Sequence, residues 1–235
     1  MTPEKLDLGV PQASLVRLAV LRRLLVFLRR ERCEFACVLE IGSYEGESAV
    51  FWSRAIGALF PLGGLVLCID PWEPYFTEEE IARSQHLARM AVDLRSGGAY
   101  NRFLRNVASS EHDRAPIHHL RSTLSMVKDV IARRYVPFDL VYIDGAHRYS
   151  AVREDIALTR TLLRDGGILC GDDLERQIEN ADLPSVRAIA EEEYVDGFHP
   201  GVSLAVHEAF GRVWSEQGVW AVRRLGQDWV KELEL

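Results

Sequence analysis

The chain has 235 residues, of which 48% are hydrophobic and 27% charged, a composition typical of a soluble globular protein with a substantial core. Its formal net charge of −7 argues against a nucleic-acid partner, because such a partner is normally bound by a basic face. The cysteines form no CxxC pair, which indicates reduced thiols of a cytoplasmic protein rather than a disulfide framework: Cys33, Cys37, Cys68 and Cys170.

The N-terminal stretch predicts a helix that does not cross a membrane. Residues 1–12 are polar and carry acidic side chains before any apolar run, unlike a secretory signal. Ser14 to Arg30 is rich in leucine and valine but carries too many arginines for a membrane span, including Arg17, Arg22 and Arg23. We expect an amphipathic helix that packs on the domain or on a second subunit, with a membrane-surface helix as the alternative.

A glycine-containing loop follows the first predicted strand. Residues 36–41 form a buried apolar run, residues 42–48 read GSYEGES, and a helix is expected from Ala49 to Ile56. In this context Gly42 permits a sharp turn, and Gly46 permits close approach of a ligand to the free N–H groups of the helix. The spacing is ExGxxxG rather than GxGxxG, so a plain tight turn is the alternative.

The second predicted strand, Leu65 to Ile69, ends at Asp70. An acidic residue at this position can accept both hydroxyls of a ribose, although it can also be a solvated strand end. Pro71 and Trp72 follow, and the indole either faces a purine or belongs to the core.

A long connection runs from Glu73 to Pro116 and is predicted to be an insertion at the ligand edge. Thr77 and Glu80 match a capping box, which opens a helix that continues to about Leu94. A second helix is expected at about 100–107. The segment can form a lid, a substrate wall or an oligomer contact, and the pattern leaves these open.

The chain then supplies three further predicted strands. The first is short, at 118–122, and the other two are apolar runs at 140–143 and 168–170. Between the last two, Ser150 to Leu163 has helical spacing, and Gly166-Gly167 is expected to turn the chain into the final run. This strand–helix–strand order predicts a parallel unit with a right-handed crossover.

Three aspartates end these strands and are expected to meet at one edge of the sheet. Asp144 follows one strand, and Asp172-Asp173 follows its neighbour, so their carboxylates should lie side by side. Crowded carboxylates need a compensating cation, and oxygen ligands suit Mg²⁺. The alternative is that Asp172-Asp173 caps a following helix while Asp144 is a loop residue.

The C-terminal part predicts a helix and a hairpin. Residues 174–198 are acidic, with Glu191–Glu193 expected on a solvated helix face. A helix is expected at 200–210, beginning with proline. A Gln-Gly turn between apolar runs then predicts an antiparallel hairpin over 212–224.

As a set, these motifs resemble the class I S-adenosylmethionine-dependent methyltransferases, and within them the macrocin O-methyltransferase-like group that acts on sugars of natural products. The resemblance implies a Rossmann-like, doubly wound α/β fold with a mostly parallel seven-stranded sheet, a C-terminal antiparallel hairpin, and extra N-terminal and lid helices. It places the methyltransferase domain at 35–235, with an insertion at about 73–116, after an N-terminal helical segment at 1–34. The residues that carry it are Val38–Ser48, Ile69–Pro71, Ile143–His147, and Gly166-Gly167 followed by Asp172-Asp173.

The resemblance also implies roles by position. The metal would bind the acceptor hydroxyl, lower its pKa and align it with the methyl group. Its implied ligands are Asp144, Asp172 and Asp173. The implied cofactor-binding residues are Glu40, Gly42, Ser43, Tyr44, Gly46, Ser48, Asp70, Pro71, Trp72, Ser122 and Asp144.

The general base is not assigned by the resemblance. Catechol-type methyltransferases use a lysine close to the metal, but here no lysine lies between Lys128 and Lys231. The candidates are His147, whose ordinary pKa is near neutrality, and an unligated oxygen of Asp144. His147 can instead anchor the cofactor or cap the helix near Ser150.

The predicted function is that of a Mg²⁺-dependent O-methyltransferase that uses S-adenosylmethionine and a small hydroxylated acceptor, with a sugar or glycosylated natural product as the expected class. The alternatives are a metal-independent methyltransferase with His147 as base, and a nucleotide-cofactor-binding oxidoreductase, against which the missing middle glycine argues. We expect no nucleic-acid or membrane partner and a cytoplasmic location, and leave homo-oligomerisation through the N-terminal helix open.

Overall fold

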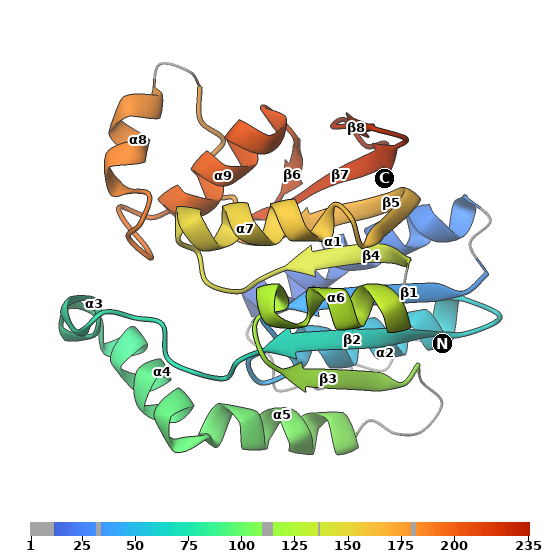
Figure 1. The fold of residues 1–235 in the computed structure, drawn as a ribbon, viewed down its shortest axis with the longest axis horizontal. Coiled ribbons are helices and arrows are strands. Elements are labelled where there is room, and N and C mark those ends of the chain that lie inside the picture. The colour runs from blue at the N-terminus through green and yellow to red at the C-terminus, as the bar shows by residue number, and fades with distance from the viewer. Residues whose placement is uncertain (1–11, 32–33, 110–114, 136, 180–181) are drawn as a thin grey trace.

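A twisted sheet with helices on both faces forms the protein (Figure 1). The computed structural model describes residues 12–31, 34–109, 115–135, 137–179 and 182–235. Cys33 and the first eleven residues therefore lie outside the described part. Within that part, no helix combines the length and the apolar character needed to cross a membrane.

The sheet has the order β3-β2-β1-β4-β5-β7-β6, and β8 pairs with β7. Strands β3, β2, β1, β4 and β5 are parallel, whereas β6, β7 and β8 pair in antiparallel fashion. This confirms the predicted fold, to which β8 adds an eighth strand. The strands are β1 (Ala36–Ile41), β2 (Gly64–Asp70), β3 (Ile117–Arg121), β4 (Phe138–Ile143), β5 (Leu163–Gly171), β6 (Trp214–Glu216), β7 (Val219–Leu225) and β8 (Asp228–Val230).

The helices divide between the two faces of the sheet. In Figure 1, α6 and α7 lie in front of the strands and α1 and α2 behind them, while α3 to α5 extend along the β3 edge. The buried side chains accordingly form two large clusters, one on each face. The helices are α1 (Gln12–Arg30), α2 (Glu47–Leu59), α3 (Glu78–Arg83), α4 (Gln85–Ser96), α5 (Gly98–Ala108), α6 (Leu124–Arg134), α7 (Tyr149–Thr159), α8 (Leu183–Ile189) and α9 (Pro200–Phe210).

The N-terminal helix α1 packs on the domain itself, against α2 and β7. Its leucines recur at helical spacing, and Leu18, Leu21, Leu25 and Leu28 are all buried while Arg22 is exposed. Each fully buried leucine contributes roughly 1.5–3 kcal/mol. The amphipathic pattern therefore predicted the inward face of this helix correctly.

The 73–116 segment differs from its prediction in one respect. The capping box of Thr77 and Glu80 is present, but the helix it opens ends at Arg83. Ser84 adopts an extended conformation and its side chain accepts a hydrogen bond from the N–H of Leu87, which starts α4. A serine that can serve as a new N-cap therefore breaks the expected single helix in two.

The segment from α7 to the end of β5 also differs from its prediction. The helix expected to reach Leu163 ends at Thr159, and Gly166-Gly167 lies inside β5 rather than in a turn before it. The pairing of β5 with β4 shifts register between Phe138 and Leu140, so β5 carries extra residues there. Gly166, at φ +77°, adopts the backbone conformation that such an irregularity requires.

Candidate functional site

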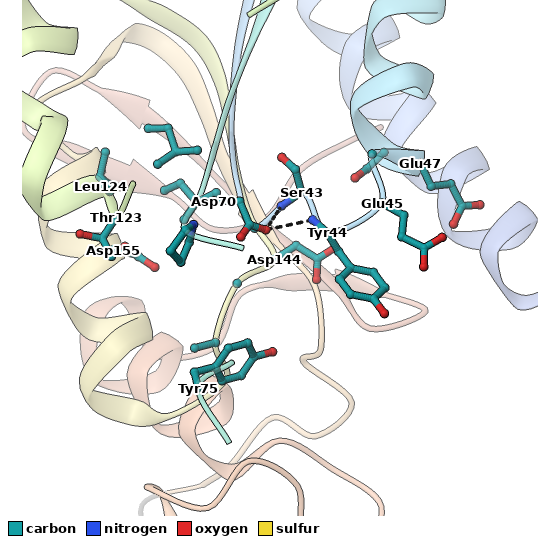
Figure 2. Close-up of a pocket in the computed structure, with 18 of the residues that line it drawn as sticks. Ser43, Tyr44, Glu45, Glu47, Asp70, Tyr75, Thr123, Leu124, Asp144 and Asp155 are labelled. Carbon is teal, nitrogen blue, oxygen red and sulfur yellow. Dashed lines mark hydrogen bonds between the residues drawn. The ribbon is translucent and has the colours of Figure 1, made fainter. Parts of the chain in front are cut away.

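A cavity of about 970 Å³ opens at the carboxyl edge of β1, β2 and β4. This is where the strand order reverses, between β1 and β4, and where open α/β sheets bind ligands. Figure 2 shows Ser43, Tyr44, Asp70 and Asp144 converging on it from separate strand ends. The predicted cofactor residues that line it are Gly42, Ser43, Tyr44, Gly46, Ser48, Asp70, Pro71, Ser122 and Asp144.

The glycine loop needs its glycines for close approach. Gly42 has φ +83°, and a Cβ there would lie 2.1 Å from the carbonyl oxygen of Asp144. Helix α2 starts directly after Gly46, which has φ +84°, so the first N–H groups of the helix lie beside the cavity. Tyr44, a non-glycine residue, is also held at positive φ, as often happens at functional turns.

Asp70 shapes this loop. Its Oδ2 accepts hydrogen bonds from the backbone N–H groups of Ser43 and Tyr44, each at 2.9 Å (Figure 2). Its Oδ1 accepts a third from the N–H of Trp72 at 2.6 Å. A carboxylate has roughly four acceptor directions, so Asp70 keeps limited capacity for a ribose hydroxyl while it holds the loop.

Glu40 and Trp72 support the loop from beneath instead of lining the cavity. Glu40 is fully buried, its Oε1 accepts from the Ser43 hydroxyl at 2.6 Å, and burial raises its pKa to about 7. The indole of Trp72 is 1% exposed and donates to the carbonyl of Tyr44 at 2.7 Å. The structure thus places Trp72 in the core, the alternative that the sequence left open.

The three aspartates come together as their strand positions predicted. Ligand oxygens of Asp144, Asp172 and Asp173 lie within 4.8 Å of one another. An all-oxygen donor set of this kind fits a hard divalent cation. No helix begins between residues 174 and 179, all of which are described, so Asp172-Asp173 does not cap a following helix.

Groups that the sequence reasoning missed also contact this cluster, among them Arg17, Tyr142 and His199, whose Nδ1 lies 3.7 Å from Oδ1 of Asp173. Nη1 of Arg17, on α1, lies 2.5 Å from Oδ2 of Asp172 and 3.8 Å from Oδ2 of Asp144. The hydroxyl of Tyr142 donates to Asp144 at 3.1 Å and lies 3.4 Å from Asp172. Burial and the neighbouring aspartates nevertheless raise the pKa of Asp144 to about 8.

His147 lies between two carboxylates. Its Nε2 is 2.7 Å from Oδ2 of Asp173, and its Nδ1 is 2.5 Å from Oε1 of Glu193. Burial opposes the imidazolium, but the two carboxylates outweigh it and raise the pKa of His147 well above its ordinary value. This pKa shift favours an imidazolium that forms an ion pair with Asp173 through Nε2, rather than a free base.

Glu193 itself corrects a prediction. Residues 191–193 follow α8 in a turn, and Glu193 is only 3% exposed, so it does not belong to a solvated helix face. No local pattern distinguishes it from Glu191 and Glu192, both of which are exposed. Its burial results from the approach of the His147 loop, a contact that the sequence does not reveal.

Helix α3 reaches the same region. Oε2 of Glu80 is 2.5 Å from Nη2 of Arg148, and Oε1 of Glu80 accepts from the N–H of Glu193 at 3.1 Å. Glu80 therefore joins the 73–116 segment to the loop after β4 and to the turn after α8. Tyr75, from the same segment, lines the cavity (Figure 2).

A further carboxyl group, that of Asp155, lines the cavity. This residue of α7 lies close to Thr123 and Leu124 (Figure 2). Burial, and secondarily Glu154, raises the pKa of Asp155 to about 7. The sequence reasoning did not single out this residue, because it lies on a helix that was expected only to pack.

Comparisons with known proteins agree with this geometry. A family model described as "Methyltransferase domain" matches residues 39–174, more than half of the chain, including the glycine loop and all three aspartates. The solved O-methyltransferase NovP has a TM-score of 0.58 at 15% identity and covers 89% of this chain and 79% of its own. CalS11, described as a TDP-rhamnose 3'-O-methyltransferase of calicheamicin biosynthesis, has a TM-score of 0.54 at 14% identity and covers 95% and 85%. No curated protein matches.

Proposed function

The chain belongs to the methyltransferase-domain family, and from this membership we propose that it methylates a hydroxyl of a small molecule with the help of a divalent cation. The membership confirms the resemblance and the enzyme class predicted from the sequence, an S-adenosylmethionine-dependent methyltransferase of class I. It also removes the oxidoreductase alternative. The observation that carries the proposal is that one cavity is lined by the glycine loop, Asp70 and Asp144, and that a carboxylate oxygen of Asp144 lies within 4.8 Å of those of Asp172 and Asp173.

The cofactor half of the cavity supports binding of S-adenosylmethionine, which supplies the methyl group. The N–H groups at the start of α2 and the loop of Gly42 to Ser48 would hold its methionine part. Asp70 would accept from its ribose, and Pro71 and Ser122 would border its adenine. Glu40 and Trp72 would keep the loop in place from the core.

The metal half would use Asp144, Asp172 and Asp173 as ligands for Mg²⁺, which would supply Lewis-acid polarisation of the acceptor hydroxyl. His147 would orient Asp173 through Nε2, with Glu193 holding the ring from the other side. A divalent cation beside Asp144 would lower the pKa of this carboxyl from about 8, so we assign the proton-accepting role to Asp144, whereas two carboxylates favour the protonated form of His147. His147 is then a positioning residue.

The acceptor would lie between the 73–116 segment, which would act as a lid, and the turn after α8. These segments are joined by Glu80, and Tyr75 faces the cavity from the lid. We propose a sugar or glycosylated natural product as the acceptor, on the basis of the macrocin-type motifs.

We propose a cytoplasmic location, which the free, buried cysteines Cys68 and Cys170 support.

A second candidate is metal-independent methyl transfer. The observation that favours it is the pairing of Arg17 with Asp172, because this arginine already offsets part of the charge of the aspartates. Substrate alignment in the closed cavity would then supply most of the acceleration.

Calorimetric titration of S-adenosylmethionine, first in EDTA and then in excess Mg²⁺, tests the cofactor assignment, with NAD⁺ as the control ligand. We expect micromolar binding of S-adenosylmethionine and none of NAD⁺. Absence of binding, or binding of NAD⁺, would contradict the proposal.

The metal assignment needs a second experiment. Asp172→Asn should abolish Mg²⁺-dependent turnover while S-adenosylmethionine affinity stays nearly intact, whereas the exposed Asp228→Asn should leave both unchanged. Full activity of Asp172→Asn, or activity that persists in EDTA, would instead favour the metal-independent candidate.

A further inference from the structure

The side chain of Arg17 is supplied to the aspartate cluster by an element outside the predicted methyltransferase domain. It comes from α1, within the predicted 1–34 segment, and lies 155 positions from Asp172 in sequence. The Arg17 side chain is 26% exposed and that of Asp172 is 6% exposed. The contact therefore lies at the inner end of the cluster, largely shielded from solvent.

Helix α1 is held so that Arg17 stays in this position. Leu18 and Leu21, which follow it one and four positions later, are buried. Farther along, Nη1 of Arg23 lies 2.7 and 2.8 Å from the two carboxylate oxygens of Glu216 on β6. These anchors oppose sliding of the helix, so withdrawal of the guanidinium requires rotation of its own side chain or loosening of the first turns of α1.

A metal ion and this guanidinium would both draw on the carboxylate of Asp172. Arg17 occupies Oδ2 of Asp172 at 2.5 Å and lies 3.8 Å from Oδ2 of Asp144. An ion bound by these carboxylates would lie within a few ångströms of the guanidinium, where two cations repel strongly in a partly buried site. The two cannot share Oδ2 in the observed arrangement.

We propose that Arg17 is the resident counter-ion of the Asp144–Asp172 pair and competes with a divalent cation for Asp172. This inference rests on the proposed metal site. It makes the N-terminal helix part of the active site, because metal loading then requires the guanidinium to leave. It also accounts for how three aspartates remain together when no metal is bound.

The test is direct titration with Mn²⁺, followed by the electron paramagnetic resonance signal of the free ion. We compare the wild type, Arg17→Met, and Arg22→Met, which removes an exposed arginine from the same helix. We expect Arg17→Met to bind Mn²⁺ at least about tenfold more tightly than the wild type, since one competing cation is gone, and Arg22→Met to match the wild type. Adding Asp172→Asn to Arg17→Met should remove the gain.

The outcomes separate the two proposals. Equal or weaker Mn²⁺ binding by Arg17→Met would overturn the role of Arg17 and leave the metal site standing. Absence of Mn²⁺ binding in every variant would overturn the metal site and the competition together. If Arg17→Met does not fold, Arg17→Lys carries the test, because a compact ammonium cannot reproduce the planar contact and should give an intermediate gain.

Discussion

Nδ1 of His147 lies 2.5 Å from Oε1 of Glu193, a residue that is 3% exposed and 46 positions away in the chain. The other ring nitrogen faces Asp173 at 2.7 Å. The imidazole thus connects the turn after α8 to one of the three clustered aspartates. This connection makes the protonation of His147 depend on a segment with no recognisable motif.

Removing one of these two carboxylates should lower the pKa of His147. Carboxylates favour the imidazolium, so we expect Glu193→Gln to lower this pKa by about one unit or more. Stabilisation by the charged ring is fully present below the pKa of the unfolded chain and is lost as the pH rises through the folded pKa. In the variant this loss should therefore be complete at lower pH. Nuclear magnetic resonance of the imidazole signals measures the shift. The exposed Glu192→Gln is the control, and an unchanged His147 pKa in Glu193→Gln would refute the pairing.

Loss of Asp70 should damage cofactor binding selectively. Asp70→Ala removes the acceptor for the N–H groups of Ser43 and Tyr44, so the loop loses its shape along with a ribose contact. We expect S-adenosylmethionine affinity to fall about tenfold to a hundredfold, the effect of roughly one or two lost hydrogen bonds to a charged group. Mn²⁺ binding should not change, because Asp70 is not in the aspartate cluster. The exposed Asp129→Ala is the matched control in both titrations, and a parallel loss of Mn²⁺ binding would indicate general misfolding.

The ion pair of Glu80 and Arg148 should hold the 73–116 segment against the loop after β4. Their side chains are 15% and 19% exposed, so solvent screens the pair only partly. A double-mutant cycle with Glu80→Gln and Arg148→Met, followed by urea unfolding, should give a coupling of about 1–3 kcal/mol. The exposed helical pair Glu79 and Arg83 serves as the comparison and should give less than about 0.5 kcal/mol. Equal coupling energies for the two pairs would mean that the Glu80–Arg148 pair does not hold the 73–116 segment.

Asp155 should make the protein less stable at high pH. Burial raises its pKa to about 7, so the folded state binds a proton that the unfolded state releases near pH 4. The free energy of unfolding should therefore fall as the pH rises through this window, by at most roughly 4 kcal/mol from this group. Asp155→Asn should reduce that fall, as measured by urea unfolding at about pH 5 and pH 8. The exposed Asp129→Asn should retain the wild-type pH dependence of stability. If Asp155→Asn also retained it, the raised pKa of Asp155 would be disproved.

Local patterns in the sequence predicted most of the fold. The capping box of Thr77, the glycine loop before α2 and the hairpin of β6 and β7 all lie where spacing and turn chemistry indicated. The predicted element boundaries that were wrong lie at Ser84 and Gly166. Each of these residues is compatible with two kinds of local structure. Ser84 can lie inside a helix or cap a new one, and a glycine pair can form a turn or an irregular strand. Neighbouring elements decide between such options.

The sequence by itself determined the meeting of the aspartates. Parallel pairing sets Ile41 opposite Ile143 and Ile143 opposite Gly171, so the residues that follow these strands must emerge together. Only the tertiary structure decided that Arg17 and Glu193 would join them. Each reaches the site by side-chain packing between elements far apart in the chain, and no periodicity encodes which residue of a distant helix or turn will face a given strand end.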